Sequence, residues 1–153
     1  MCPTPRNDPA SRWENMDSFV EAQRQFDIEH WARAAPLGVG DVCRLADIPA
    51  DNPWSKAAVA TAEATLLREF EDTVAMNSSG RIHNSFTQYL GEGLIFKFGG
   101  EWVRIPPDVA PELGEYGVRH GEFDSLSPVE SLVREAVRLR SGSVWLSVLS
   151  YEM

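Results

Sequence analysis

The first part of the chain carries apolar residues at helical spacing. A helix is expected over residues 11–35, because large apolar side chains recur there every three or four positions. They are Trp13, Met16, Phe19, Val20, Phe26 and Trp31. Ser11 and Ser18 each precede a glutamate by three residues, the spacing of a helix-starting capping box. Pro36-Leu37-Gly38 is predicted to end this helix, and a short helical turn is expected over residues 41–46.

Two further helices are predicted in the middle of the chain. Asn52 suits a helix cap and Pro53 the first helical position, so the longest helix is expected from there to about Asn77. A second helix is expected over residues 81–98, ending at Gly99-Gly100, because glycine accepts the left-handed turn after a helix. Its expected buried stripe is Ile82, Phe86, Tyr89, Leu90, Leu94 and Phe98.

The pattern changes after Gly100. Residues 102–105 alternate between apolar and polar like a strand, and residues 115–120 and 121–126 predict two more short strands. Ser127-Pro128-Val129-Glu130 predicts a capping box with proline at the first helical position, opening a helix to about Arg140. Residues 144–149 fit a strand or a helix, and the helix is favoured. The predicted fold class is α+β, with a mainly helical N-terminal half, a small antiparallel sheet of about three short strands and a C-terminal helix. Residues 1–10, with three prolines, predict a flexible tail before a single domain over residues 11–153.

The net charge of the chain limits the kinds of molecule that it is expected to bind. The chain has 153 residues and a net charge of −9, from 23 acids and 14 bases. This balance repels nucleic acid and anionic membranes, so neither is expected as a partner, whereas a basic protein would be attracted. Solubility alone also explains the charge. The candidate partner-binding residues are the acids of the most acidic stretch, Glu101, Asp108, Glu112, Glu115, Glu122 and Asp124.

Motifs for chemistry are few. The chain has two cysteines and three histidines, and the histidines lie too far apart in the sequence for a paired zinc motif. No phosphate-binding loop or nucleophile elbow occurs, so no cofactor and no metal are expected. Cys43 is interpreted as a core thiol. The absence of a disulfide framework, a signal peptide and a long apolar run predicts a cytoplasmic location.

One polar face and the tryptophans suggest possible sites. His83, Gln88 and Glu92 are candidate ligand-binding residues, with His83 and Glu92 as an acid–base pair, on the expectation that they share a face of the helix over residues 81–98. The favoured alternative is a solvated face, with Gly91 and Gly93 where another element crosses. Trp13, Trp31, Trp54, Trp102 and Trp145 are interpreted as core or core-edge residues in preference to binding hot spots.

A resemblance covers roughly residues 60–140. Tyr89-Leu90-Gly91-Glu92 followed by Gly99-Gly100-Glu101-Trp102-Val103 resembles small bacterial domains of unknown function, in which a YLGE helix leads to a GGEW strand entry. Some domains of that kind are immunity proteins, which neutralise a toxin by binding it. Others have no assigned role. The resemblance to the immunity proteins among them implies a binding function, and it carries over no catalytic residues. It does not extend to the region before Pro53.

The sequence is therefore compatible with three functions. The first is a non-catalytic bacterial binding protein, of the immunity type, that blocks a basic toxin surface. The second is a small enzyme or ligand-binding domain using His83, Gln88 and Glu92. The third is a structural or oligomerisation module in which tryptophans form a self-interface. The sequence leaves the oligomeric state open.

Overall fold

The computed structural model of the chain describes residues 9–78, 80–106, 108, 113–120 and 125–150, and for residues 9–24 it gives the backbone course alone. The elements, in chain order, are α1 (Pro9–Ala46), α2 (Lys56–Glu69), α3 (Thr73–Asn77), α4 (Gly80–Phe98), β1 (Glu101–Arg104), β2 (Tyr116–His120), β3 (Ser125–Ser127), α5 (Val129–Leu139) and α6 (Val144–Val148). The predicted α+β class, with its mainly helical N-terminal half, small sheet and C-terminal helix, is confirmed. The predicted division into a tail and one domain stays a prediction, because residues 1–8 lie outside the described part.

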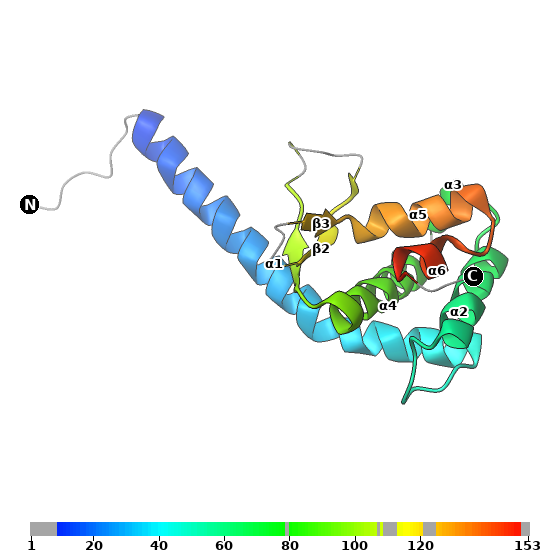
Figure 1. Cartoon of the computed structure of the whole chain (residues 1–153). Coiled ribbons are helices and arrows are strands. Elements are labelled where there is room, and N and C mark those ends of the chain that lie inside the picture. Colours follow the sequence, from blue (N-terminus) through cyan, green and yellow to red (C-terminus); the bar gives the residue numbers. More distant parts are fainter. Residues whose placement is uncertain (1–8, 79, 107, 109–112, 121–124, 151–153) are drawn as a thin grey trace, which may run out of the picture.

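Helix α4 is the centre of the fold. It packs against α1 on one side and against α3, α5 and β2 on others (Figure 1). Every residue over 85–91 is buried, although this stretch includes Ser85, Thr87 and Gln88. The predicted buried stripe is confirmed at Phe86, Tyr89, Leu90 and Leu94, whereas Ile82 and Phe98 near the helix ends are exposed. A helix covered on several sides must bury some of its polar side chains. Buried polar groups usually have hydrogen-bond partners, so those of α4 mark places where a partner or a ligand is expected.

The predicted end of the first helix at Pro36 is wrong, because α1 continues through this proline to Ala46. A proline inside a helix removes one hydrogen bond and costs about 3 kcal/mol. Packing on both sides of it offsets this cost. Ala35 before the proline and Val42 and Cys43 after it all belong to the buried core.

The predicted long helix from Pro53 is also wrong in its start and its continuity. Helix α2 begins at Lys56, with the Ser55 hydroxyl accepting a hydrogen bond from the Ala58 amide at 3.1 Å. It ends before Phe70, and Arg140 reaches across from the end of α5 to donate to the carbonyls of Phe70, Glu71 and Leu67 at 2.6–2.9 Å. Asp72 then caps the separate helix α3.

The three strands form one antiparallel sheet in the order β1-β2-β3, which confirms the predicted sheet. Its register places Glu101 opposite Arg119 and Trp102 opposite Val118. The sheet joins α1 through an ion pair between Arg104 and Asp27. The Trp31 ring of α1 also stacks on Tyr116 of β2, with ring centroids 3.8 Å apart.

The predicted helix after Ser127 is confirmed, but its predicted capping box is wrong. Pro128 is the cap residue of α5 and no side chain caps the helix start. Glu130 instead accepts hydrogen bonds from the amides of Glu115 and Tyr116, both at 3.0 Å, and so ties α5 to the start of β2. The favoured helix for the last segment is confirmed as α6.

The core interpretation of the tryptophans and of Cys43 is confirmed where the structure describes them. Trp31, Trp102 and Trp145 are buried, as is Cys43, whose pKa is raised by burial. Trp54 is half-buried, and the side chain of Trp13 lies outside the described residues. A self-interface built from the three buried tryptophans would therefore require the core to open.

Candidate binding groove

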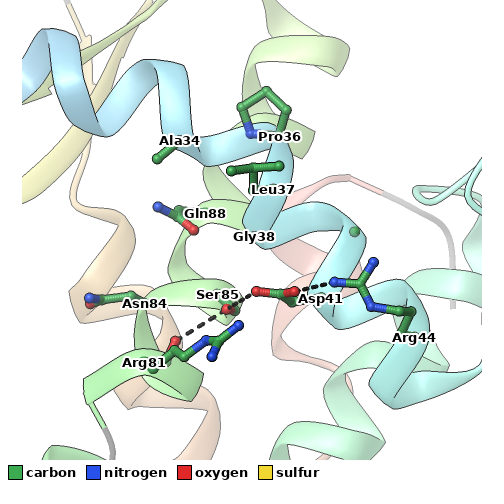
Figure 2. Close-up of a pocket in the computed structure, with 11 residues that line it drawn as sticks. Ala34, Pro36, Leu37, Gly38, Asp41, Arg44, Arg81, Asn84, Ser85 and Gln88 are labelled. Atoms are coloured by element: carbon green, nitrogen blue, oxygen red, sulfur yellow. Dashed lines mark hydrogen bonds and ion pairs between the residues drawn. The ribbon is translucent and has the colours of Figure 1, made fainter.

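An open groove runs between α1 and α4, with a volume of about 740 Å³ (Figure 2). We call it the α1–α4 groove. Helix α1 supplies one side of it and α4 supplies the other. Its lining residues include Ala34, Pro36, Leu37, Gly38, Asp41, Arg44, Arg81, Asn84, Ser85 and Gln88.

The groove has a polar end held by a small network. Asp41 forms an ion pair with Arg44 and accepts a hydrogen bond from the Ser85 hydroxyl at 3.2 Å. The same hydroxyl lies 3.1 Å from the Arg81 carbonyl oxygen, one turn earlier in α4. The exposed Arg81 guanidinium has no ion pair among the residues that the structure describes. This end therefore presents hydrogen-bond donors to whatever lies in the groove.

The groove continues past Ala34 into a second hollow of about 280 Å³. This hollow shares Asn84 and Gln88 with the first and adds the rings of Phe26, His30, Trp31 and Tyr116. Phe26 is 63 % exposed and its ring stacks on His30. The character of the lining thus changes from charged at one end, through two amides, to aromatic at the other.

Gln88 is the residue that makes this groove a candidate site. The residue as a whole is only 9 % exposed, and its amide forms no hydrogen bond with another described residue, although it is not among the fully buried polar groups that lack a partner. It lies against Gly38 of α1, where a methyl group in place of the glycine hydrogen would come within 2.0 Å of the Gln88 Oε1 atom. An amide that lines a groove can hydrogen-bond to water or to a molecule bound there.

The structure separates the predicted acid–base pair. His83 and Glu92 are nine residues apart in α4, so they lie on opposite sides of the helix and about 13.5 Å apart along its axis. They do not share a face of α4. They therefore cannot act as an acid–base pair in one site. The expected solvated face is wrong too, since Thr87, Gln88 and Gly91 are buried.

His83 and Glu92 each have their own surroundings. The His83 Nε2 atom is buried without a partner among the described residues, and burial together with nearby Arg134 lowers its pKa. Glu92 accepts a hydrogen bond from the Trp102 indole at 3.3 Å. Burial raises the pKa of Glu92, although this hydrogen bond opposes the rise.

The glycines beside Glu92 lie where other elements pack on α4, as the favoured alternative expected. A methyl group at Gly91 would come within 2.0 Å of the Trp102 ring, and one at Gly93 within 2.8 Å of the Trp54 ring. Tryptophans from β1 and from the loop before α2 therefore pack directly on the α4 backbone.

The predicted acidic surface is partly neutralised by its own strands. Glu101 pairs with Arg119 across the β1–β2 ladder, and Glu115 lies 3.9 Å from Arg104. Asp108 is exposed. Glu112, Glu122 and Asp124 lie outside the described residues, so the predicted binding role of the surface stays a prediction.

The sequence pattern singled out a groove residue on α4 but none of those on α1. Gln88 was a candidate residue, but Asp41, Arg44 and Ser85 were not. The α1 wall was missed because the first helix was expected to end at Pro36. Gly38, a small residue inside a continuing helix, is the signal of a close helix crossing in this region.

No known protein-family model, curated protein or solved structure matches this chain. The resemblance to immunity-type domains therefore stays a prediction. In the part of the chain that the structure describes, no group of three or more histidine, cysteine, aspartate or glutamate side chains is placed to hold a metal ion. No described helix has the length and apolar character needed to cross a membrane.

Proposed function

We propose that this chain is a non-catalytic binding protein whose α1–α4 groove holds an extended segment of a partner polypeptide. The observation that carries the proposal is Gln88, a largely buried residue that lines the groove and whose amide forms no hydrogen bond with another described residue, so that it can bond to a molecule in the groove. A primary amide has two donor hydrogens and an acceptor oxygen, so it can pair with both the N–H and the C=O of a peptide backbone.

The spacing of the two amides in the groove suits an extended chain. Asn84 and Gln88 are four residues apart in α4, which places them about 6 Å apart along the helix axis. Alternate residues of an extended peptide repeat about every 6.6 Å. Two successive backbone groups on one side of a peptide can therefore each meet one amide.

Exposed apolar side chains flank the two amides. Leu37 is 72 % exposed beside the charged end, and Phe26 is 63 % exposed at the aromatic end. Apolar anchors beside fixed polar groups are the usual composition of a recognition site, in which the anchors supply affinity and the polar groups supply orientation.

The net charge of −9 favours a basic partner, because opposite charge speeds association. An immunity-type protein that blocks a basic toxin is the narrower form of this proposal, and its support is the YLGE and GGEW resemblance. A cytoplasmic location goes with that narrower form.

The test is the affinity for peptides selected from a displayed random library on the wild-type protein. Gln88→Leu keeps the side-chain size and removes the amide, so it should weaken the selected peptides about tenfold, since a buried hydrogen bond contributes about 1 kcal/mol or more. Asn84→Ala should weaken them about threefold, because its amide is exposed and competes with water. Titration calorimetry measures both.

The matched control is Asn77→Ala, which removes an exposed asparagine from α3, outside the groove. It should leave the affinity unchanged, and thermal unfolding of all three variants checks that each is folded. Selection of no peptide, or of peptides that bind folded Gln88→Leu as tightly as the wild type, would contradict the proposal.

A further inference from the structure

A separate hollow borders Pro36, which also lines the α1–α4 groove. We call it the Trp54 pocket. It has a volume of about 300 Å³ and is lined by α1 (Pro36, Val39), the loop before α2 (Asp51, Trp54) and α4 (Glu92, Phe96). Its volume is at the lower limit of small-molecule sites, which suits a single side chain better than a large cofactor.

Two rings form the aromatic wall of the pocket. Trp54 and Phe96 stack with ring centroids 5.2 Å apart and an interplanar angle of 29°. The Trp54 indole is fixed by a hydrogen bond to the Tyr89 carbonyl oxygen at 3.0 Å and by its contact with Gly93. Phe96 is 69 % exposed, so one face of the pair is accessible from outside.

Two carboxylates share the pocket with these rings. Glu92 lies one turn before Phe96 in α4, and Asp51 is exposed in the loop. Neither has a cationic partner among the described residues. Within the described part of the chain, the Glu92 carboxylate has one hydrogen bond, from the neutral Trp102 indole, and burial raises its pKa.

We propose that the Trp54 pocket binds a lysine or arginine side chain of the partner polypeptide. Its aliphatic stem would pack on Val39 and the Trp54–Phe96 pair, and its charged end would meet Glu92 and Asp51. Long basic side chains combine an apolar stem with a charged tip, and aromatic rings also attract cations directly. The source of the side chain rests on the proposed function, since Pro36 borders both the groove and the pocket. The pocket itself can be tested without any peptide.

The probes are N-acetyl-lysine methylamide and N-acetyl-arginine methylamide, with N-acetyl-norleucine methylamide as the uncharged comparison. Two-dimensional NMR should show a saturable shift of the Trp54 indole N–H with one or both basic probes. Norleucine should bind at least about fivefold more weakly, because it lacks the charge that the carboxylates and rings attract.

Glu92→Gln should weaken the basic probe about fivefold, since it removes the better-buried charge and keeps an oxygen for the Trp102 indole. Glu69→Gln is the matched control, because it changes the net charge equally at an exposed position on α2. It should leave binding unchanged. Absence of a saturable shift, equal binding of norleucine, or an equal loss in Glu69→Gln would overturn the inference.

The same variants separate this inference from the proposed function. Probe binding that survives Gln88→Leu, in a protein that selects no peptide, would support the cation site and contradict the groove. Selected peptides that depend on Gln88 but bind Glu92→Gln normally, together with no probe binding, would support the groove and contradict the cation site.

Discussion

Replacing Glu63 with alanine is expected to lower the free energy of unfolding by about 3–5 kcal/mol, because it removes the charged acceptor of two buried hydrogen bonds. Glu63 is fully buried in α2. Its two carboxylate oxygens accept from the amides of Trp145 at 2.7 Å and Val144 at 3.1 Å, at the start of α6. Without it these two amides at the start of α6 lose their partners, and the backbone of Trp145 loses its hydrogen bond to α2.

Chemical denaturation measures this loss, and Glu69→Ala is the matched control. Glu69 lies on the same helix with its side chain exposed, so its removal should change stability by no more than about 0.5 kcal/mol. If Glu63→Ala does not fold, Glu63→Gln should still fold with a smaller loss, because one acceptor oxygen remains. Equal effects at positions 63 and 69 would show that the buried carboxylate does not hold α6.

The Glu63→Gln variant also tests the direction of the Glu63 pKa shift. Burial raises the pKa of the Glu63 carboxyl above its ordinary value of 4.5, although the two amide hydrogen bonds oppose the rise. The folded state then holds a proton that the unfolded state has already lost. Relative to Glu63→Gln, the wild type should therefore lose stability as the pH rises from 4.5 through the raised pKa, and the difference should become constant above it. A wild type that instead gains stability as the pH rises towards 4.5 would mean that the amides lower the pKa below its ordinary value.

The parts of this fold that the sequence predicts well are those fixed by neighbours in the chain. Helix α4 was expected within one residue of its observed start, and its end at Gly99 and Gly100 follows from their positive φ angles of 74° and 117°. The antiparallel strands follow from short alternating segments separated by glycines and prolines. In each case a few adjacent residues determine the backbone geometry.

The parts that the sequence does not predict depend on residues far apart in the chain. Arg140 lies 70 residues from Phe70, whose carbonyl it caps, and Glu63 lies 82 residues from Trp145. Helix α1 continues past Pro36 because packing on either side of the proline outweighs its local cost. No pattern within a window of ten or twenty residues contains this information.

The candidate site shows the same division. The polar residues of α4 could be singled out from the sequence, and Gln88 does lie in a groove. The sequence did not predict which of these residues lie in the same hollow, because that depends on where other elements pack against α4. Gly38 brings α1 onto Gln88, while Gly93 brings Trp54 beside Glu92. One helix therefore contributes to two separate hollows, where the sequence suggested a single polar face.

Gly38→Ala is the second change with a large expected effect, because it tests whether this close crossing positions the groove. The new methyl group would lie 2.7 Å from the Gln88 Cβ atom, which is fixed to the α4 backbone and cannot rotate away. The helices must then separate, and we expect a loss of about 2–3 kcal/mol in unfolding free energy, typical of overpacking in a core. Peptides that depend on Gln88 should also bind more weakly to this variant.

Gly40→Ala provides the matched control two residues further along the same helix. Its methyl group would meet only the end of the flexible Arg44 side chain, at 3.5 Å. Alanine is the better helix former, so this variant should be about 0.5–1 kcal/mol more stable than the wild type. Opposite signs at positions 38 and 40 in chemical denaturation would locate the crossing at Gly38. A stabilising effect at both positions would mean that α1 does not press on Gln88, and the position of Gln88 in the groove would lose its structural basis.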